Sequence, residues 1–506
     1  MNDPLSRLDV LSDRLSPVVV KEVRQFVRSR EFVASFATSL LIALLIAFFG
    51  SMQALAGSRA AGQWTFTTLT ACLALLGLAV VPLGAFTTLR TERLEQTLEL
   101  ISLTTMSPRR IVVGKLAAQA VKLVTFFAVM MPFIATSFLL GGVDFVTILT
   151  TMVTVFLMSL WVAAAALFAS TMFRSRLLSG LAFGVIAVVV FIGYNASPML
   201  FLAFRFGSPA AVFAGASASA TGRWWAYAAM VVFCLVTMMN LVLLAESRLA
   251  LPTENRASVL RLGFLVQFLL IVAWPLRWMF QSATFTTQSL QALTVFGGLH
   301  LALIAAFAVT EGLALPDPRV APPSWLRRWK WLQPVFGPGG SRAALYVLLQ
   351  MALFVAAGAL LSATASEVRL LIALCGAICL FTGVPSLLVH RFSSRGLGAL
   401  HARGMMLILL MLSLVLPDIL YYIFWRPEVF SVQFSARHLF SPVIPLFNWD
   451  SVLTNRWELP PMMWAVVGIL SYVRMMRVSA AGVREAEPLT TLRILPESDA
   501  GDTHSR

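Results

Sequence analysis

Residues Val33–Phe49 read VASFATSLLIALLIAFF, a run without a charged side chain. A helix of roughly 20 mostly apolar residues is long enough to cross the hydrocarbon core of a bilayer. The run therefore predicts a membrane-spanning helix. The residues that precede it are charged and amphipathic over a length too great for an ordinary signal peptide, so we interpret it as a retained first membrane helix.

Further apolar runs of spanning length follow along the chain, and they predict an all-α, polytopic membrane protein with about 12 transmembrane helices. The predicted spans are Val33–Phe49, Leu69–Phe86, Leu116–Leu140, Phe145–Met172, Leu178–Tyr194, Trp225–Ala245, Leu262–Phe280, Gln291–Val309, Ala343–Leu361, Leu370–Val389, Gly404–Trp425 and Pro461–Met476. Similar loop lengths in the two halves predict a 6+6 arrangement, with halves at 1–257 and 258–477. The polar tail, 478–506, is expected to be cytoplasmic and to lack stable structure.

The composition excludes a water-soluble fold. Of the 506 residues, 59% are hydrophobic and 12% are charged, and the mean hydropathy is +0.84. Soluble domains carry about a quarter charged residues. The net charge of +15 would suggest nucleic acid in a soluble protein, but here it indicates basic cytoplasmic loops, so no nucleic-acid partner is expected.

The distribution of Lys and Arg predicts the orientation. With the N-terminus and C-terminus both in the cytoplasm, only 8 of the 38 Lys and Arg residues fall on outer segments. These are Arg59, Arg205, Arg223, Arg277, Arg369, Arg426, Arg437 and Arg456. This excess of basic residues on one side follows the positive-inside rule.

No motif in the chain predicts catalysis. The four cysteines lie in apolar stretches without nearby His or acidic residues, which is typical of small core residues and not of a metal site. The chain lacks a phosphate-binding loop, an H-E-x-x-H zinc motif and a G-x-S-x-G elbow. We therefore expect a protein that is not an enzyme and holds no cofactor or metal of its own.

The segment Pro17–Phe32, PVVVKEVRQFVRSREF, predicts an amphipathic helix that lies in the membrane interface. Its apolar face holds Val19, Val20, Val23, Phe26 and Val27. Its charged residues lie largely elsewhere and are Lys21, Glu22, Arg24, Arg28 and Arg30. The alternative is a plain basic flank that only sets the topology.

The segment Thr87–Leu116, TTLRTERLEQTLELISLTTMSPRRIVVGKL, is longer than the joining of two helices requires. Within it, Arg90–Leu103 predicts a helix with Leu94, Leu98 and Ile101 on one side and Glu92, Glu95 and Glu99 on another. Ser107-Pro108 predicts a break, followed by a basic helix through Arg109, Arg110 and Lys115. An amphipathic helix of this kind either covers its own membrane domain or docks into a soluble partner.

Together these stretches resemble the ABC-2 type permease family, the membrane subunits of ATP-binding-cassette exporters. The resemblance covers roughly residues 17–257 and rests on PVVVKEVR (17–24), ERLEQTLEL (92–100), Ser107-Pro108 and IVVGKL (111–116). Gln96 stands where the family usually has Gly, and Met106-Ser107-Pro108 is a looser version of its break.

The resemblance implies an interfacial helix with Lys21, Arg24, Phe26 and Arg28, and a coupling helix that sits in a cleft of a separate ABC ATPase subunit. The coupling residues would be Glu92, Leu94, Glu95, Thr97, Leu98, Glu99, Ile101 and Pro108. ATP and Mg would bind the ATPase alone. Closure of two ATPases would rock the membrane helices, giving alternating access or lateral release. The implied location is a bacterial cytoplasmic (inner) membrane.

Two ionisable residues at membrane depth are candidates for a transport site, because charges in the bilayer are costly. Asp418 follows Pro417 in the eleventh predicted span, and His300 lies midway along the eighth. For Asp418 the alternative is a position near the interface at a proline kink. For His300 it is a hydrogen-bonded core histidine.

The second half leaves several alternatives open. Its matching loop is Pro-rich and basic, so the chain could be a pseudo-dimer with one degenerate coupling surface. Alternatively, the second six helices are an accessory domain, and the first half pairs with a second permease or with another copy of the chain. Besides the exporter subunit, in contact with membrane lipids, two other functions remain: a twelve-helix secondary carrier and a non-transporting scaffold or assembly factor.

Overall fold

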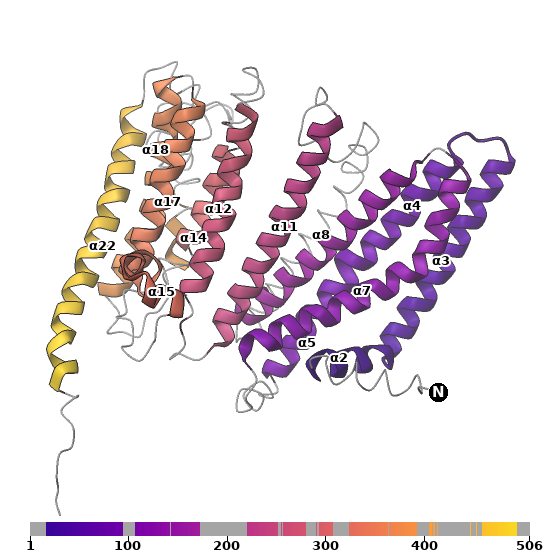
Figure 1. Cartoon of the computed structure of the whole chain (residues 1–506), viewed down its shortest axis with the longest axis horizontal. Coiled ribbons are helices and arrows are strands. Elements are labelled where there is room, and N and C mark those ends of the chain that lie inside the picture. Colours follow the sequence, from indigo (N-terminus) through magenta and orange to yellow (C-terminus); the bar gives the residue numbers. More distant parts are fainter. Residues whose placement is uncertain are drawn as a thin grey trace, which may run out of the picture. The chain divides into compact units, whose positions relative to one another are not determined.

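The computed structural model describes residues 17–94, 107–141, 143–172, 220–250, 257–279, 293–306, 323–362, 364–391 and 458–492, with the short pieces 255, 290, 404–406, 408–409, 412, 446 and 452 between them. The regular elements in these residues are all helices (Figure 1). Contacts divide the chain into two compact units, Met1–Leu251 and Pro252–Arg506.

Eight helices in the described residues are long and apolar enough to cross a membrane. They are Arg30–Leu55, Ala61–Glu92, Pro108–Leu139, Phe145–Thr171, Tyr227–Leu249, Arg342–Leu361, Ala365–Val389 and Leu459–Arg477. Two predicted spans appear as shorter apolar helices, Ser258–Trp274 and Leu293–Ile304. Of the other two, Leu178–Tyr194 lies outside the described residues, as does most of Gly404–Trp425. The chain is thus a multi-pass helical membrane protein.

The first unit contains α2 (Pro17–Val27), α3 (Arg30–Leu55), α4 (Ala61–Leu75), η1 (Leu76–Val80), α5 (Val81–Leu94), α7 (Pro108–Leu139), α8 (Phe145–Met172) and α11 (Ala220–Leu249). Its core is built by α4, α5, α7 and α8, with Phe66, Phe86 and Phe126 among the fully buried side chains. By contrast, α3 exposes many large apolar side chains, such as Leu41, which suits a helix that faces lipid.

The predicted amphipathic helix ends earlier than expected. Helix α2 stops at Val27, and Ser29 begins α3 as its N-cap, with its hydroxyl accepting a hydrogen bond from the Phe32 backbone N–H (3.1 Å). The same hydroxyl donates to the Phe26 carbonyl (2.8 Å) and so closes the end of α2. A capping serine between two helices fixes a turn. The chain therefore changes direction before it enters the first span.

The second span and the following helix are continuous, which corrects the prediction of a loop from Thr87 and a separate helix from Arg90. Helix α4 passes through the π-helical turn η1 into α5, and α5 runs on to Leu94. Pro82 in the first turn of α5 lacks a backbone N–H, and a π turn absorbs such a defect without ending a helix. Residues 87–94, predicted to lie in the loop, therefore belong to this helix.

The predicted break at Ser107-Pro108 is confirmed. Pro108 opens α7, and the N–H of Arg110 bonds to the Ser107 carbonyl (2.9 Å). Proline suits the first helical turn, where its missing N–H has no partner to lose. From there α7 continues without interruption to Leu139, so the predicted basic helix is the first part of the third span.

The second unit contains α12 (Ser258–Met279), η3 (Leu293–Gly297), α14 (Gly298–Ile304), α15 (Ser324–Arg328), η5 (Lys330–Leu332), α16 (Gln333–Phe336), α17 (Gly340–Leu361), α18 (Ala365–Arg391) and α22 (Leu459–Leu492). Helices α18 and α22 lie side by side, and Gly376 meets Ala465 and Gly468 at their contact. Small residues allow such a close approach of helix backbones.

The tail prediction was wrong in its first part. Helix α22 continues to Leu492, well past the end of the predicted span at Met476. The residues that follow, VSAAGVREAE (478–487), contain Ala, Arg and Glu, which favour a helix once one has begun.

Candidate functional site

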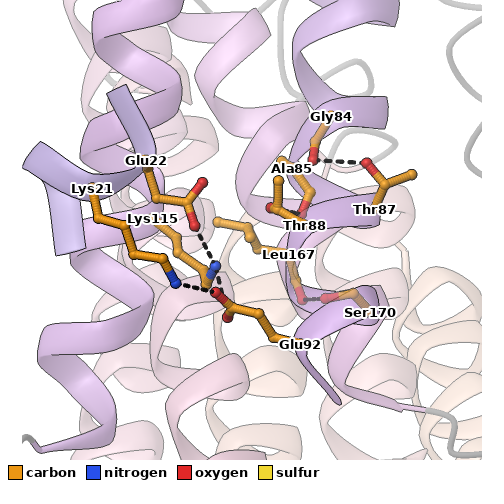
Figure 2. A network of polar contacts seen from close by, with 10 residues as sticks. All are labelled: Lys21, Glu22, Gly84, Ala85, Thr87, Thr88, Glu92, Lys115, Leu167 and Ser170. Carbon is orange, nitrogen blue, oxygen red and sulfur yellow. Dashed lines mark hydrogen bonds and ion pairs between the residues drawn. The ribbon is translucent and has the colours of Figure 1, made fainter. Parts of the chain in front are cut away.

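A buried lysine lies at the centre of the candidate site. Lys115 sits two turns into α7 with only 1% of its surface exposed. Its Nζ lies 2.7 Å from Glu22 Oε1 and 2.9 Å from Glu92 Oε2. Isolated buried charges are very costly, so a lysine in this position requires such anionic partners. We call Lys21, Glu22, Glu92 and Lys115 the ionic junction (Figure 2).

Glu22 enters the junction from α2. The side of α2 that packs on α7 carries Val19, Glu22 and Phe26, while Val27 is half exposed. The prediction that Glu22 lies away from the buried face was therefore wrong. The physical reason is that Lys115 compensates the charge of Glu22. A carboxylate can therefore lie on the buried face of α2, where apolar residues are expected.

Glu92 enters from the last turn of α5 and joins the two lysines. Besides its contact with Lys115, its Oε1 accepts a hydrogen bond from Lys21 Nζ (3.4 Å), whose side chain is 62% exposed. Figure 2 shows the carboxylates of Glu22 and Glu92 both turned toward the Lys115 ammonium. Residues from α2, α5 and α7 are thereby linked in one network with two positive and two negative charges.

A polar face of α7 continues from the junction along the third span. Gln119 and Lys122 follow Lys115 at helical spacing, and both are buried. The Lys122 ammonium lies 4.7 Å from the centre of the Phe26 ring, so a second α2 residue contacts this face through a cation–π interaction. Phe26 also packs against Phe32 and Phe126, with ring centres 4.5 and 6.5 Å apart.

The other residues predicted for the interfacial helix and the coupling helix divide into two groups. Arg24 is exposed on α2, Arg28 is exposed directly after it, and Pro108 opens α7. Leu94 is the last residue of α5, while Glu95, Thr97, Leu98, Glu99 and Ile101 lie outside the described residues. Of the predicted coupling residues, the structure thus brings Glu92 into a defined contact with the predicted interfacial residue Lys21.

His300 sits in a buried polar chain of the second unit. Its Nε2 lies 3.3 Å from Gln350 Oε1, and its ring stacks on Phe268. The Gln350 amide donates to the Tyr346 hydroxyl, which in turn donates to the Arg261 carbonyl, both at 2.6 Å. A hydrogen-bonded core histidine, the alternative considered from the sequence, accounts for this geometry. Asp418 lies outside the described residues.

The central position of Lys115 and its pairing with Glu22 were not predicted from the sequence. A signal was present, because Lys115 and Lys122 lie seven residues apart, on one face of a helix that is mostly apolar from Ile111 onward. Within the described part of the chain, no group of three or more His, Cys, Asp or Glu residues could hold a metal ion. Comparisons with protein families, with curated proteins and with solved structures gave no match.

Proposed function

We propose that this chain is the membrane-spanning permease subunit of an ATP-driven ABC transporter, an exporter of the ABC-2 type. The observation that carries the proposal is the ionic junction, which fastens α2 to the end of α5 and the start of α7. These two helix ends flank residues 95–106, where the family resemblance places the contact with the ATPase.

The ionic junction could transmit a movement from a bound partner to the membrane helices. A soluble partner that binds residues 95–101 would push on the ends of α5 and α7. Ion pairs screened from water resist separation more than exposed ones do. Because Lys115 holds Glu22 and Glu92 together, α2 and both spans would then move as one body. Such a movement would rock the helices of this unit without changing the fold of any one of them.

The remaining parts of the proposal follow from the sequence. The chain would have twelve spans in a 6+6 layout, with both termini in the cytoplasm and a bacterial inner membrane as its location. ATP and Mg would bind the partner ATPase. The exposed residues Arg24, on α2, and Arg28, directly after it, would lie in the interface near anionic head groups.

The test is a pull-down of the tagged full-length chain in mild detergent, using Leu94→Asp/Leu98→Asp to disrupt the proposed coupling surface. Thr91→Asp is the matched control, because Thr91 is exposed on the same helix one turn before Leu94. The proposal predicts that an ATP-binding-cassette ATPase co-purifies with the wild type and with Thr91→Asp, and that the double variant loses it while still inserting normally.

Absence of any ATPase, even after crosslinking, would contradict the proposal. A gradient-driven carrier would then be tested by transport with and without Asp418→Asn. A chain that binds neither an ATPase nor a transported solute would point to a scaffold.

A further inference from the structure

The second unit presents a basic and aromatic surface on the segment that precedes α17. The short helices α15, η5 and α16 fold residues 324–336 into a compact piece. Five consecutive exposed residues of this piece, Arg327, Arg328, Trp329, Lys330 and Trp331, form what we call the basic–aromatic surface. Trp329 and Trp331 are 50% and 69% exposed, and their ring centres lie 6.2 Å apart.

The opposite side of this piece is packed into the unit. Leu326 and Phe336 are buried, and the Phe336 ring lies 5.9 Å from the rings of both Trp325 and Tyr346. Gln333 closes the piece on itself by donating to the Leu326 carbonyl (3.4 Å). The basic–aromatic surface is therefore held by a packed support.

Arg261 of α12 fixes the end of the piece. Its guanidinium donates to the carbonyls of Val335 (3.0 Å), Gly337 and Gly339 (3.1 Å). Gly339 has a φ of 117°, which disfavours any other residue there. The Tyr346 hydroxyl bonds to the Arg261 carbonyl, so the buried chain that begins at His300 ends at this anchor.

The position of the surface indicates its partner. The piece lies where α12 begins and where α17 begins, and both are apolar helices, so the surface sits at the level at which membrane helices end. Indole rings favour the boundary between lipid and water. The segment 323–339 contains three basic residues, Arg327, Arg328 and Lys330, and no acidic residue.

We infer that the basic–aromatic surface binds the anionic head groups of the surrounding bilayer. The three cations would lie against phosphate groups while Trp329 and Trp331 insert at the depth of the glycerol backbone. A protein partner or a nucleic acid would also accept a basic and aromatic surface. The bilayer is favoured because the support that fixes this surface is built from the ends of the apolar helices themselves.

The test places an environment-sensitive fluorophore at position 331 of the full-length chain. Trp331→Cys provides the labelling site, and the native cysteines Cys72, Cys234, Cys375 and Cys379 are replaced by Ala to prevent background labelling. The labelled protein is reconstituted in vesicles of phosphatidylcholine alone or with added phosphatidylglycerol. We expect a blue shift of the emission with phosphatidylglycerol that diminishes at high salt, because screening shortens the range of the attraction.

Arg327→Gln/Arg328→Gln should raise the phosphatidylglycerol fraction needed for half of the shift by roughly tenfold or more. The matched control is Arg109→Gln/Arg110→Gln, which removes two exposed charges at the start of α7 and should retain the shift. Equal emission in both kinds of vesicle, or an undiminished shift in Arg327→Gln/Arg328→Gln, would overturn the inference. A shift that appears only when another protein is added would assign the surface to that protein instead. If the double variant fails to fold, the salt dependence of the unmutated surface decides the question.

Discussion

Glu22 and Lys115 lie 93 positions apart in the sequence, yet the Lys115 Nζ is 2.7 Å from Glu22 Oε1 and both side chains are almost entirely buried. The contact joins a helix that precedes the first span to the helix that forms the third. Because Glu92 contacts the same ammonium, the pair belongs to a three-helix junction and not to a surface ion pair.

Removal of the central cation should destabilise the first unit. Lys115→Met would leave the buried carboxylates of Glu22 and Glu92 without their shared partner, at a cost of about 3–5 kcal/mol in the free energy of unfolding. Glu22→Leu/Lys115→Met should recover part of that loss, because it also removes a buried charge. Titration with a denaturing detergent measures both.

Lys21→Met is the control for this series, since Lys21 is largely exposed and its pairing with Glu92 should contribute no more than about 1 kcal/mol. If Lys115→Met unfolded with the same midpoint as Lys21→Met, the junction would not stabilise the unit.

Gly376 should be required for the contact between α18 and α22. In Gly376→Ala, the new methyl group would overlap the backbone of Ala465, and overpacking of this kind costs about 1–3 kcal/mol. Gly84→Ala is the matched control, because a methyl group on that helical glycine meets open space and should be neutral or slightly stabilising. Thermal unfolding of both variants in the same detergent checks the difference, and equal midpoints would mean that the helices are not in close contact there.

The Tyr346 hydroxyl should contribute more to thermal stability than the hydroxyl of Tyr472 on α22. Tyr346→Phe removes two buried hydrogen bonds, one to the Arg261 carbonyl and one from the Gln350 amide, at about 1 kcal/mol for each. Tyr472→Phe removes a hydroxyl of equal burial, but its partner Thr382 retains a bond to the Ile378 carbonyl. The loss of thermal stability should therefore be larger in Tyr346→Phe, and the reverse order would contradict the arrangement of the polar chain.

Asp144 should stabilise the first unit at neutral pH, and this contribution should be lost in acid. Its carboxylate accepts hydrogen bonds from the hydroxyl (2.6 Å) and the backbone N–H (2.9 Å) of Thr147 at the start of α8, and these bonds hold its pKa below the ordinary value. A lowered folded-state pKa gives stability that is present at neutral pH, begins to fall near the unfolded pKa of about 3.9, and is lost below the folded value.

Asp144→Asn tests this pH dependence, because asparagine still caps a helix but does not titrate. As the pH is lowered from neutral to about 3, the wild type should lose stability relative to Asp144→Asn, measured by the unfolding midpoints of the two proteins. A difference that stays constant over this range would show that the Asp144 charge does not contribute.

The membrane spans could be predicted because hydrophobic length alone specifies them. Eight of the predicted spans appear as helices of spanning length in the described residues. The helix ends could not be predicted as well, because hydropathy does not mark where a helix stops. Thus α5 runs to Leu94, since neither Gly nor Pro interrupts residues 85–94.

The ionic junction could not be predicted from the sequence for a different reason. The spacing of apolar residues assigned Glu22 to a polar face, and only its distant partner Lys115 explains why that residue is buried. The periodicity of apolar residues describes one helix at a time, whereas the buried ion pair depends on the packing of two helices. The predicted coupling residues Glu95–Ile101 lie outside the described residues, so their role stays a prediction.

The most direct test of the proposed function is photocrosslinking in the native cell from a photoreactive amino acid at position 98. The matched position is 45, because Leu45 lies on the exposed side of the first span. We expect position 98 to capture an ATP-binding-cassette ATPase, identified by mass spectrometry, and position 45 to capture none. Capture of no ATPase at position 98, or equal capture at both positions, would contradict the proposed function.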